Sequence, residues 1–167
     1  MDRDHQLLLH FLAAIAYRAQ KALRAAPAGF ADFTPGHLVR TPVQVLRHMT
    51  SLMGLARTHF VGGSYPVQPD PLPTFDDEIA RFHATLEALG EVLRTGTRLR
   101  ELSTEQLLQG PFADTLTHVG QIAMLRRLAG SPIAPENFLY AEVRTDRLGV
   151  EQAPPARPDA HWAERPA

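Results

Sequence analysis

Three side chains of the sequence have the types and the spacing to bind one metal ion. Asp114 and His118 lie four residues apart, so on a helix both project from one face about one turn apart, where two side chains can chelate a cation. His48 interrupts an otherwise largely apolar helix face, as an inward-facing polar group does. Two imidazoles and one carboxylate leave coordination positions open for water or a substrate. His48, Asp114 and His118 are therefore candidate metal ligands.

Each of these side chains also has a simpler interpretation. A carboxylate and a histidine four residues apart on a helix more often form an exposed hydrogen-bonded pair than a metal site. A single histidine on an apolar face is more often a hydrogen-bonded core or interface residue than a ligand. The spacing thus leaves open a metal-free bundle that acts as a binding or dimerisation module, in which the three residues form a buried hydrogen-bond network.

The remaining charged and titratable residues favour structural roles. His59 is expected to stabilise the C-terminal end of its helix, where the helix dipole favours a positive charge. The acidic residues 76–78 are expected to stabilise the N-terminal end of another helix, where the dipole favours negative charges. Arg144 and Arg147 are expected on a solvated face. The other histidines are expected at the surface or in loops; they are His5, His10, His37, His83 and His161.

Composition excludes several classes of function. Lys and Arg total 17 against 18 Asp and Glu, and a net charge of −1 argues against binding to nucleic acid or an anionic membrane. The chain has no cysteine, so any thiol in its chemistry must come from another molecule. It also lacks a glycine-rich phosphate loop, a Gly-x-Ser-x-Gly elbow and a His-Glu-x-x-His pair. No segment has the roughly 18 apolar residues of a membrane span, and acidic residues precede the first apolar run, so we expect a cytoplasmic protein.

The apolar residues recur at three- and four-residue steps in four segments. This period predicts amphipathic helices over about 3–26, 42–60, 74–93 and 112–129, with a short helical turn at 103–109. Thr41 and Thr74 are predicted N-caps, and Pro42 suits a first helical position. Alternating β-branched or aromatic runs are missing. The predicted fold is an all-α four-helix bundle.

The prolines locate the connections. Residues 66–73 hold four prolines in eight positions, so the segment 61–73 is predicted to be one long crossover between helices. Four more prolines lie in the last fourteen residues. We therefore expect a bundle domain over residues 1–152 and a Pro-rich C-terminal tail over 153–167, whose role the sequence leaves open.

Two stretches of the chain resemble a known family. Residues 113–130 (ADTLTHVGQIAMLRRLAG), followed by SPIAPENF, resemble the last core helix and its exit in the DinB-like (DinB/YfiT-like) four-helix-bundle family of metal-dependent enzymes. The stretch TPVQVLRHMTSL is similar to the segment that holds the family's first metal-binding histidine. The resemblance extends from the first helix to about Gln152, and its most specific parts are the single histidine of the second helix, His48, and the His-x-Gly-Gln step at His118–Gln121. It implies an up-down-down-up bundle with one long crossover, a divalent cation between the helices, and a homodimer.

The resemblance also implies a site and a class of reaction. His48 matches the family's first histidine and His118 the last, but the usual middle histidine is Asp114 here. Compared with a strictly nitrogen site, a carboxylate in that position favours harder metals such as Mn or Fe, and the expected cofactor is a divalent cation, Zn, Ni, Mn or Fe. Characterised relatives include metal-dependent thiol S-transferases, so the resemblance implies a metal-activated low-molecular-weight thiol, or water in a hydrolase-type reaction, acting on a small-molecule substrate. Gln121 is expected to orient a ligand or the substrate, with helix packing as its alternative role.

Overall fold

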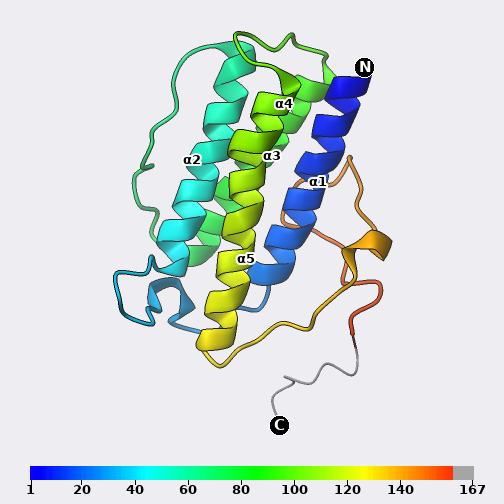
Figure 1. Cartoon of the computed structure of the whole chain (residues 1–167). Helices are drawn as coiled ribbons and strands as arrows, with labels where there is room; N and C mark the ends of the chain where they lie inside the picture. The colour runs from blue at the N-terminus through cyan, green and yellow to red at the C-terminus, as the bar shows by residue number, and fades with distance from the viewer. Residues whose placement is uncertain (160–167) are drawn as a thin grey trace.

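The computed structural model describes residues 1–159 and contains four long helices around one apolar core (Figure 1). These helices are α1 (Arg3–Leu23), α2 (Pro42–Val61), α3 (Phe75–Arg94) and α5 (Ala113–Leu128). A short helix, α4 (Thr104–Leu107), leads into α5 through the π-helical turn η2 (Leu108–Phe112), and η1 (Phe30–Asp32) and η3 (Phe138–Tyr140) are single 3₁₀ turns. The described residues form no strand, only an isolated bridge between Glu136 and Pro158. The predicted all-α four-helix fold is confirmed.

The helices run in two directions. Figure 1 shows α1 and α5 running one way and α2 and α3 the other, with residues 62–74 returning along the bundle from the end of α2 to the start of α3. Contacts at the helix ends agree with this arrangement: Arg47 near the start of α2 pairs with Glu78 near the start of α3. Arg126 in the last turn of α5 donates to the carbonyl of Ala22 at the end of α1. The topology is the up-down-down-up order with one long crossover.

Reciprocal hydrogen bonds fix the starts of α2 and α3. The hydroxyl of Thr41 accepts from the backbone amide of Gln44, whose side chain accepts from the amide of Thr41. Thr74 and Asp77 form the equivalent pair at the start of α3. Such pairs satisfy amide groups that lack partners within the helix, and the proline that follows Thr41 has no such amide to satisfy. Both predicted N-caps are therefore confirmed.

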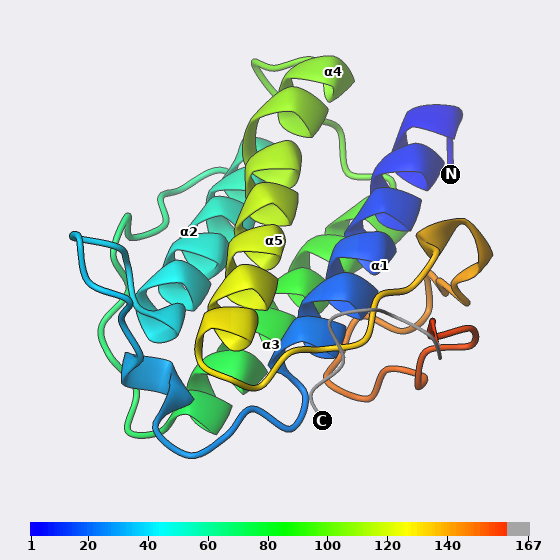
Figure 2. The same cartoon turned by 60° about the horizontal axis from the view of Figure 1, so that its bottom comes forward.

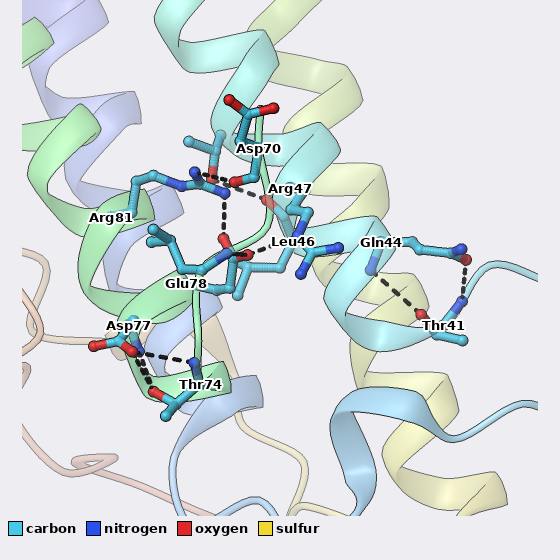
Figure 3. A network of polar contacts seen from close by, with 11 residues as sticks. Thr41, Gln44, Leu46, Arg47, Asp70, Thr74, Asp77, Glu78 and Arg81 are labelled. Carbon is cyan, nitrogen blue, oxygen red and sulfur yellow. Dashed lines mark hydrogen bonds and ion pairs between the residues drawn. The ribbon is translucent and has the colours of Figure 1, made fainter. Parts of the chain in front are cut away.

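The acidic run at the start of α3 does more than suit the helix dipole. Glu78 is buried, and its carboxylate lies 2.6 Å from Nε of Arg47 while also pairing with Arg81 (Figure 3). It accepts from the amide of Leu72 at 2.9 Å, and Arg81 donates to the carbonyl of Asp70 at 2.7 Å. Glu78 therefore joins α2, α3 and the crossover through one carboxylate. This role was not predicted, because the sequence gives no sign of which arginines lie nearby.

Two histidines that were expected at the surface or in loops are buried instead. His83 is 1% exposed, and its Nδ1 donates to the carbonyl of Leu148 at 2.7 Å. His5 is also buried, with Nδ1 beside the carboxylate of Asp2 and Nε2 beside the carbonyl of Thr97. The expectation was wrong for both, because their partners come from segments distant in sequence.

The last part of the chain passes beside the bundle. Arg24 donates to the carbonyl of Gln152 at 2.6 Å, and the amide of Asp159 donates to the carbonyl of Pro135 at 2.9 Å. The predicted domain boundary at residue 152 stays a prediction, and residues 160–167, with His161 and Trp162, lie outside the described residues. No described helix is both long enough and apolar enough to cross a membrane.

Candidate metal centre

The three candidate ligands converge between α2 and α5. Nε2 of His118 lies 3.3 Å from Oδ1 of Asp114, and Nε2 of His48 lies 3.7 Å from Oδ2 of the same carboxylate. The two imidazole rings stand nearly perpendicular, with their centroids 4.8 Å apart. One ligand atom from each residue lies within 4.8 Å of the other two. The structure thus brings together the residues that the sequence singled out.

Local sequence explains why α5 presents Asp114 and His118 at this depth. Pro111 lacks an amide hydrogen, and Gly110 before it has a non-helical backbone, so the helical path is interrupted between α4 and α5. α5 then begins at Ala113, which places Asp114 in its first turn and His118 one turn later. On α2, the hydrogen bonds at Thr41 and the ion pair of Arg47 hold the first turns beside His48.

Exposure differs along the site. The side chain of His118 is 10% exposed, that of His48 29% and that of Asp114 46%. The site therefore has a closed side at His118 and an open side at Asp114. A ligand from solvent can approach a cation there without displacing a helix.

Gln121 sets the orientation of the His118 ring. Its amide oxygen lies 2.8 Å from Nδ1 of His118, one turn further along α5. With that oxygen accepting the Nδ1 hydrogen, Nε2 of the neutral ring keeps a lone pair, and Nε2 is the atom that faces Asp114. A hydrogen bond of this kind to the nitrogen that does not bind metal is typical of histidine ligands.

The surroundings of His48 favour the neutral form of its ring. Partial burial lowers the pKa of His48, and the nearby His118 and Arg40 lower it further, while Asp114 opposes them. A neutral imidazole has the lone pair that metal binding requires. The electrostatic environment therefore favours the ligating form of His48.

The donor types suit a divalent cation, and the two ion-pair distances, each to a different oxygen of Asp114, lie near the spacing that a shared ion requires. Two donors that are each about 2.0–2.2 Å from a shared ion lie about 3–3.5 Å apart in tetrahedral geometry. The His118–Asp114 distance of 3.3 Å agrees with this range, and the His48–Asp114 distance of 3.7 Å slightly exceeds it. Two imidazoles and one carboxylate suit Zn, Ni, Mn or Fe and leave coordination positions open.

Two hollows adjoin the site and meet at Arg40. The first has a volume of about 450 Å³, is lined by His118 and Gln121, and is otherwise mostly apolar, with walls from Val39, Val45, Leu125 and Leu128. The second has a volume of about 510 Å³ and is lined by His48 together with polar side chains and residues 67–71 of the crossover. Arg40 lines both hollows. A small molecule in either hollow would lie next to a candidate ligand.

Comparison of the chain with protein-family models, with curated proteins and with solved structures finds no match. The resemblance to the DinB-like family therefore stays a prediction. What the structure itself supports is an all-α four-helix protein with a candidate metal site of two histidines and one aspartate.

Sequence reasoning did not identify Arg40 as a residue of the site. Arg40 directly precedes Thr41, the N-cap of α2, and its side chain is exposed. It lies about two helical turns before His48. The one feature of the sequence that could have pointed to Arg40 is its position directly before a well-defined helix start. The two hollows that give Arg40 its significance depend on residues from α2, α5 and the crossover, which no local pattern brings together.

Proposed function

We propose that this protein is a divalent-metal-dependent enzyme that uses His48, Asp114 and His118 as ligands. The observation that carries the proposal is the convergence of three ligand atoms within 4.8 Å, one each from His48, Asp114 and His118. A cation held there would lower the pKa of a thiol or water molecule bound beside it and so supply a nucleophile. Because the chain has no cysteine, a thiol substrate would come from a separate low-molecular-weight compound.

The chain's own residues would bind and orient the reactants. Gln121 holds the His118 ring through Nδ1, so that Nε2 stays directed at the site. The mostly apolar hollow beside His118 accommodates the body of an electrophilic substrate, and the polar hollow beside His48 accommodates the more hydrophilic reactant. Arg40 lies between them and supplies a positive charge to an anionic group on either reactant.

Metal analysis of protein purified without an affinity tag tests the proposal. We expect near-stoichiometric divalent metal in the parent and at least about a tenfold reduction in His48→Ala and His118→Ala, because each loses one of three protein ligands. His10→Ala is the matched control, since His10 is an exposed histidine of α1 outside the site. Circular dichroism verifies that all variants are folded.

A parent protein that retains less than about a tenth of an equivalent of metal after incubation with Mn, Fe, Ni and Zn would contradict the metal site. Metal content that is equal in the parent and in both site variants would contradict the ligand assignment. Either result would favour the metal-free binding or dimerisation module. The homodimer itself stays a prediction, which light scattering coupled to gel filtration would test.

A further inference from the structure

Another hollow lies between α1 and α5, whereas the candidate metal ligands lie between α2 and α5. Its volume is about 360 Å³. After α5 the chain crosses toward α1 (Figure 2), and residues 133–138 of this segment form one wall. α1 contributes charged side chains and Ala22, and α5 contributes mainly apolar or small residues, namely Val119, Gly120, Ala123 and Met124. The hollow can therefore hold an apolar body of small size.

Two of the charged side chains in this hollow form an ion pair with each other. The carboxylate of Glu136 is 1% exposed, accepts from the hydroxyl of Tyr17 at 2.7 Å and lies 3.3 Å from Nζ of Lys21. Nζ of Lys21 also donates to the carbonyl of Ala134 at 2.8 Å. Glu136 and Lys21 thus neutralise each other as an ion pair, although Oε2 of Glu136 has no hydrogen-bond partner. Arg127 also lines the hollow.

Arg18 has no such counter-charge among the described residues. Its guanidinium carbon lies 4.1 Å from the centroid of the Phe138 ring, so the group is stacked on an apolar wall. Its Nε atom is buried without a hydrogen-bond partner. Burial lowers the pKa of Arg18, and no carboxylate acts on it in the opposite sense. A partly desolvated guanidinium without an acceptor is energetically unfavourable, and a bound anion would relieve this.

We propose that this hollow binds a small monocarboxylate with an apolar body, with the carboxylate on Arg18 and the body against α5. A guanidinium and a carboxylate match in shape and form paired, charge-assisted hydrogen bonds. A single guanidinium without a carboxylate partner, Arg18, suits a monoanion better than a phosphate dianion, which requires more donors than the apolar walls provide. The site is separate from the candidate metal ligands and does not depend on them.

Calorimetric titration of the chelator-treated protein with hexanoate tests the proposal, with hexanol as the neutral analogue of the same length. We expect hexanoate to bind saturably and hexanol to bind at least about tenfold more weakly, because hexanol cannot pair with a guanidinium. Arg18→Gln should weaken hexanoate binding about tenfold and leave hexanol binding unchanged. Arg3→Gln, an exposed arginine of the same helix, is the matched control and should bind hexanoate as the parent does.

A second variant tests the hollow without removing a charge. A Cβ added at Gly120 meets no atom within 4 Å, and any other common helix residue is more favourable than glycine inside a helix. Gly120→Leu should therefore remain folded, fill the hollow and weaken hexanoate binding at least about tenfold.

Three results would overturn the proposal. The first is a parent that does not bind hexanoate, and the second is unchanged affinity in both Arg18→Gln and Gly120→Leu. The third is loss of binding in His118→Ala, which would locate the carboxylate at the candidate metal centre. Unchanged binding in His118→Ala would support a separate site.

Discussion

Nδ1 of His118 lies 2.8 Å from the amide oxygen of Gln121, while Nε2 of the same ring lies 3.3 Å from the carboxylate of Asp114. If Nδ1 of a neutral ring donates to Gln121, a lone pair on Nε2 faces a carboxylate, and a cation between them would stabilise this arrangement. Without a cation the amide can reverse, so that Nε2 carries the hydrogen and donates to Asp114. Gln121 therefore couples the tautomer of His118 to metal binding.

Removing the Gln121 amide should weaken metal binding without removing a ligand. We expect Gln121→Ala to lower metal affinity about 10- to 100-fold, because the ring loses the partner that fixes its tautomer and orientation. Competition with a chromogenic chelator measures the affinity. Gln6→Ala, an exposed glutamine of α1, is the control. Equal affinities in parent and Gln121→Ala would assign Gln121 to helix packing alone.

Placing a histidine at position 114 should change which metal the site prefers. Asp114→His replaces the oxygen donor by an imidazole, so we expect affinity for Zn and Ni to rise relative to Mn by about tenfold. Asp114→Ala should lose affinity for all four metals tested. Parallel titrations with Mn, Fe, Ni and Zn measure the ratio. A Zn-to-Mn ratio that is the same in the parent and in Asp114→His would show that Asp114 is not a ligand.

Arg40 should affect a substrate but not the metal. We expect Arg40→Gln to retain the metal content of the parent, because Arg40 is a lining residue and not a candidate ligand. For an anionic substrate, the variant should raise KM about tenfold, since a charged hydrogen bond to the substrate is lost. Lower metal content in Arg40→Gln would contradict this role, and an unchanged KM would show that the substrate's anionic group binds elsewhere.

Local patterns were sufficient for the helices and for the three candidate ligands. Thr41 and Thr74 cap α2 and α3 as predicted, because a cap is defined by residues within one turn. Asp114 and His118 share a face for the same reason, and His48 was identified because a polar residue interrupts an apolar face. Helix ends were less accurate: α1 was predicted to end at about residue 26 and ends at Leu23.

The features that sequence reasoning missed all depend on distant segments. His83 is buried against Leu148, and Glu78 pairs with Arg47 across the α2–α3 contact. The guanidinium of Arg18 stacks on the ring of Phe138, which lies on a segment after the last long helix. A periodic pattern gives the face on which a residue lies, but it does not give the partner that the face meets.

Buried His83 should make the protein less stable in mild acid. Burial lowers the pKa of His83, whereas the unfolded chain takes up the proton near the ordinary value of about 6.5. The free energy of unfolding should therefore fall as the pH falls below about 6.5, by at most about 1.4 kcal/mol per pH unit from this residue. His83→Gln should lose less stability than the parent between about pH 7.5 and about pH 5.5, measured by urea unfolding.

His5 supplies the control of opposite sign. Its pKa is raised: burial acts to lower it, but the carbonyl of Thr97 and the carboxylate of Asp2 together outweigh burial. The stabilisation from His5 is fully present in acid and is lost as the pH rises through the pKa of the folded protein. His5→Gln should therefore lose more stability than the parent over the same acid range. Identical pH slopes in the parent and both variants would contradict both assignments.

Removing the buried carboxylate that joins α2, α3 and the crossover should have the largest effect on stability. Glu78 is 1% exposed and accepts hydrogen bonds from Arg47, Arg81 and the amide of Leu72. Glu78→Gln therefore leaves two arginines without their acidic partner. We expect the free energy of unfolding to fall by about 3 kcal/mol, as for other buried ion pairs that lose one member. Glu91→Gln is the matched control, because Glu91 pairs with Arg94 at the surface and its loss should change stability by less than about 1 kcal/mol. Urea unfolding followed by circular dichroism measures both values, and equal losses in the two variants would show that Glu78 contributes no more than a surface pair.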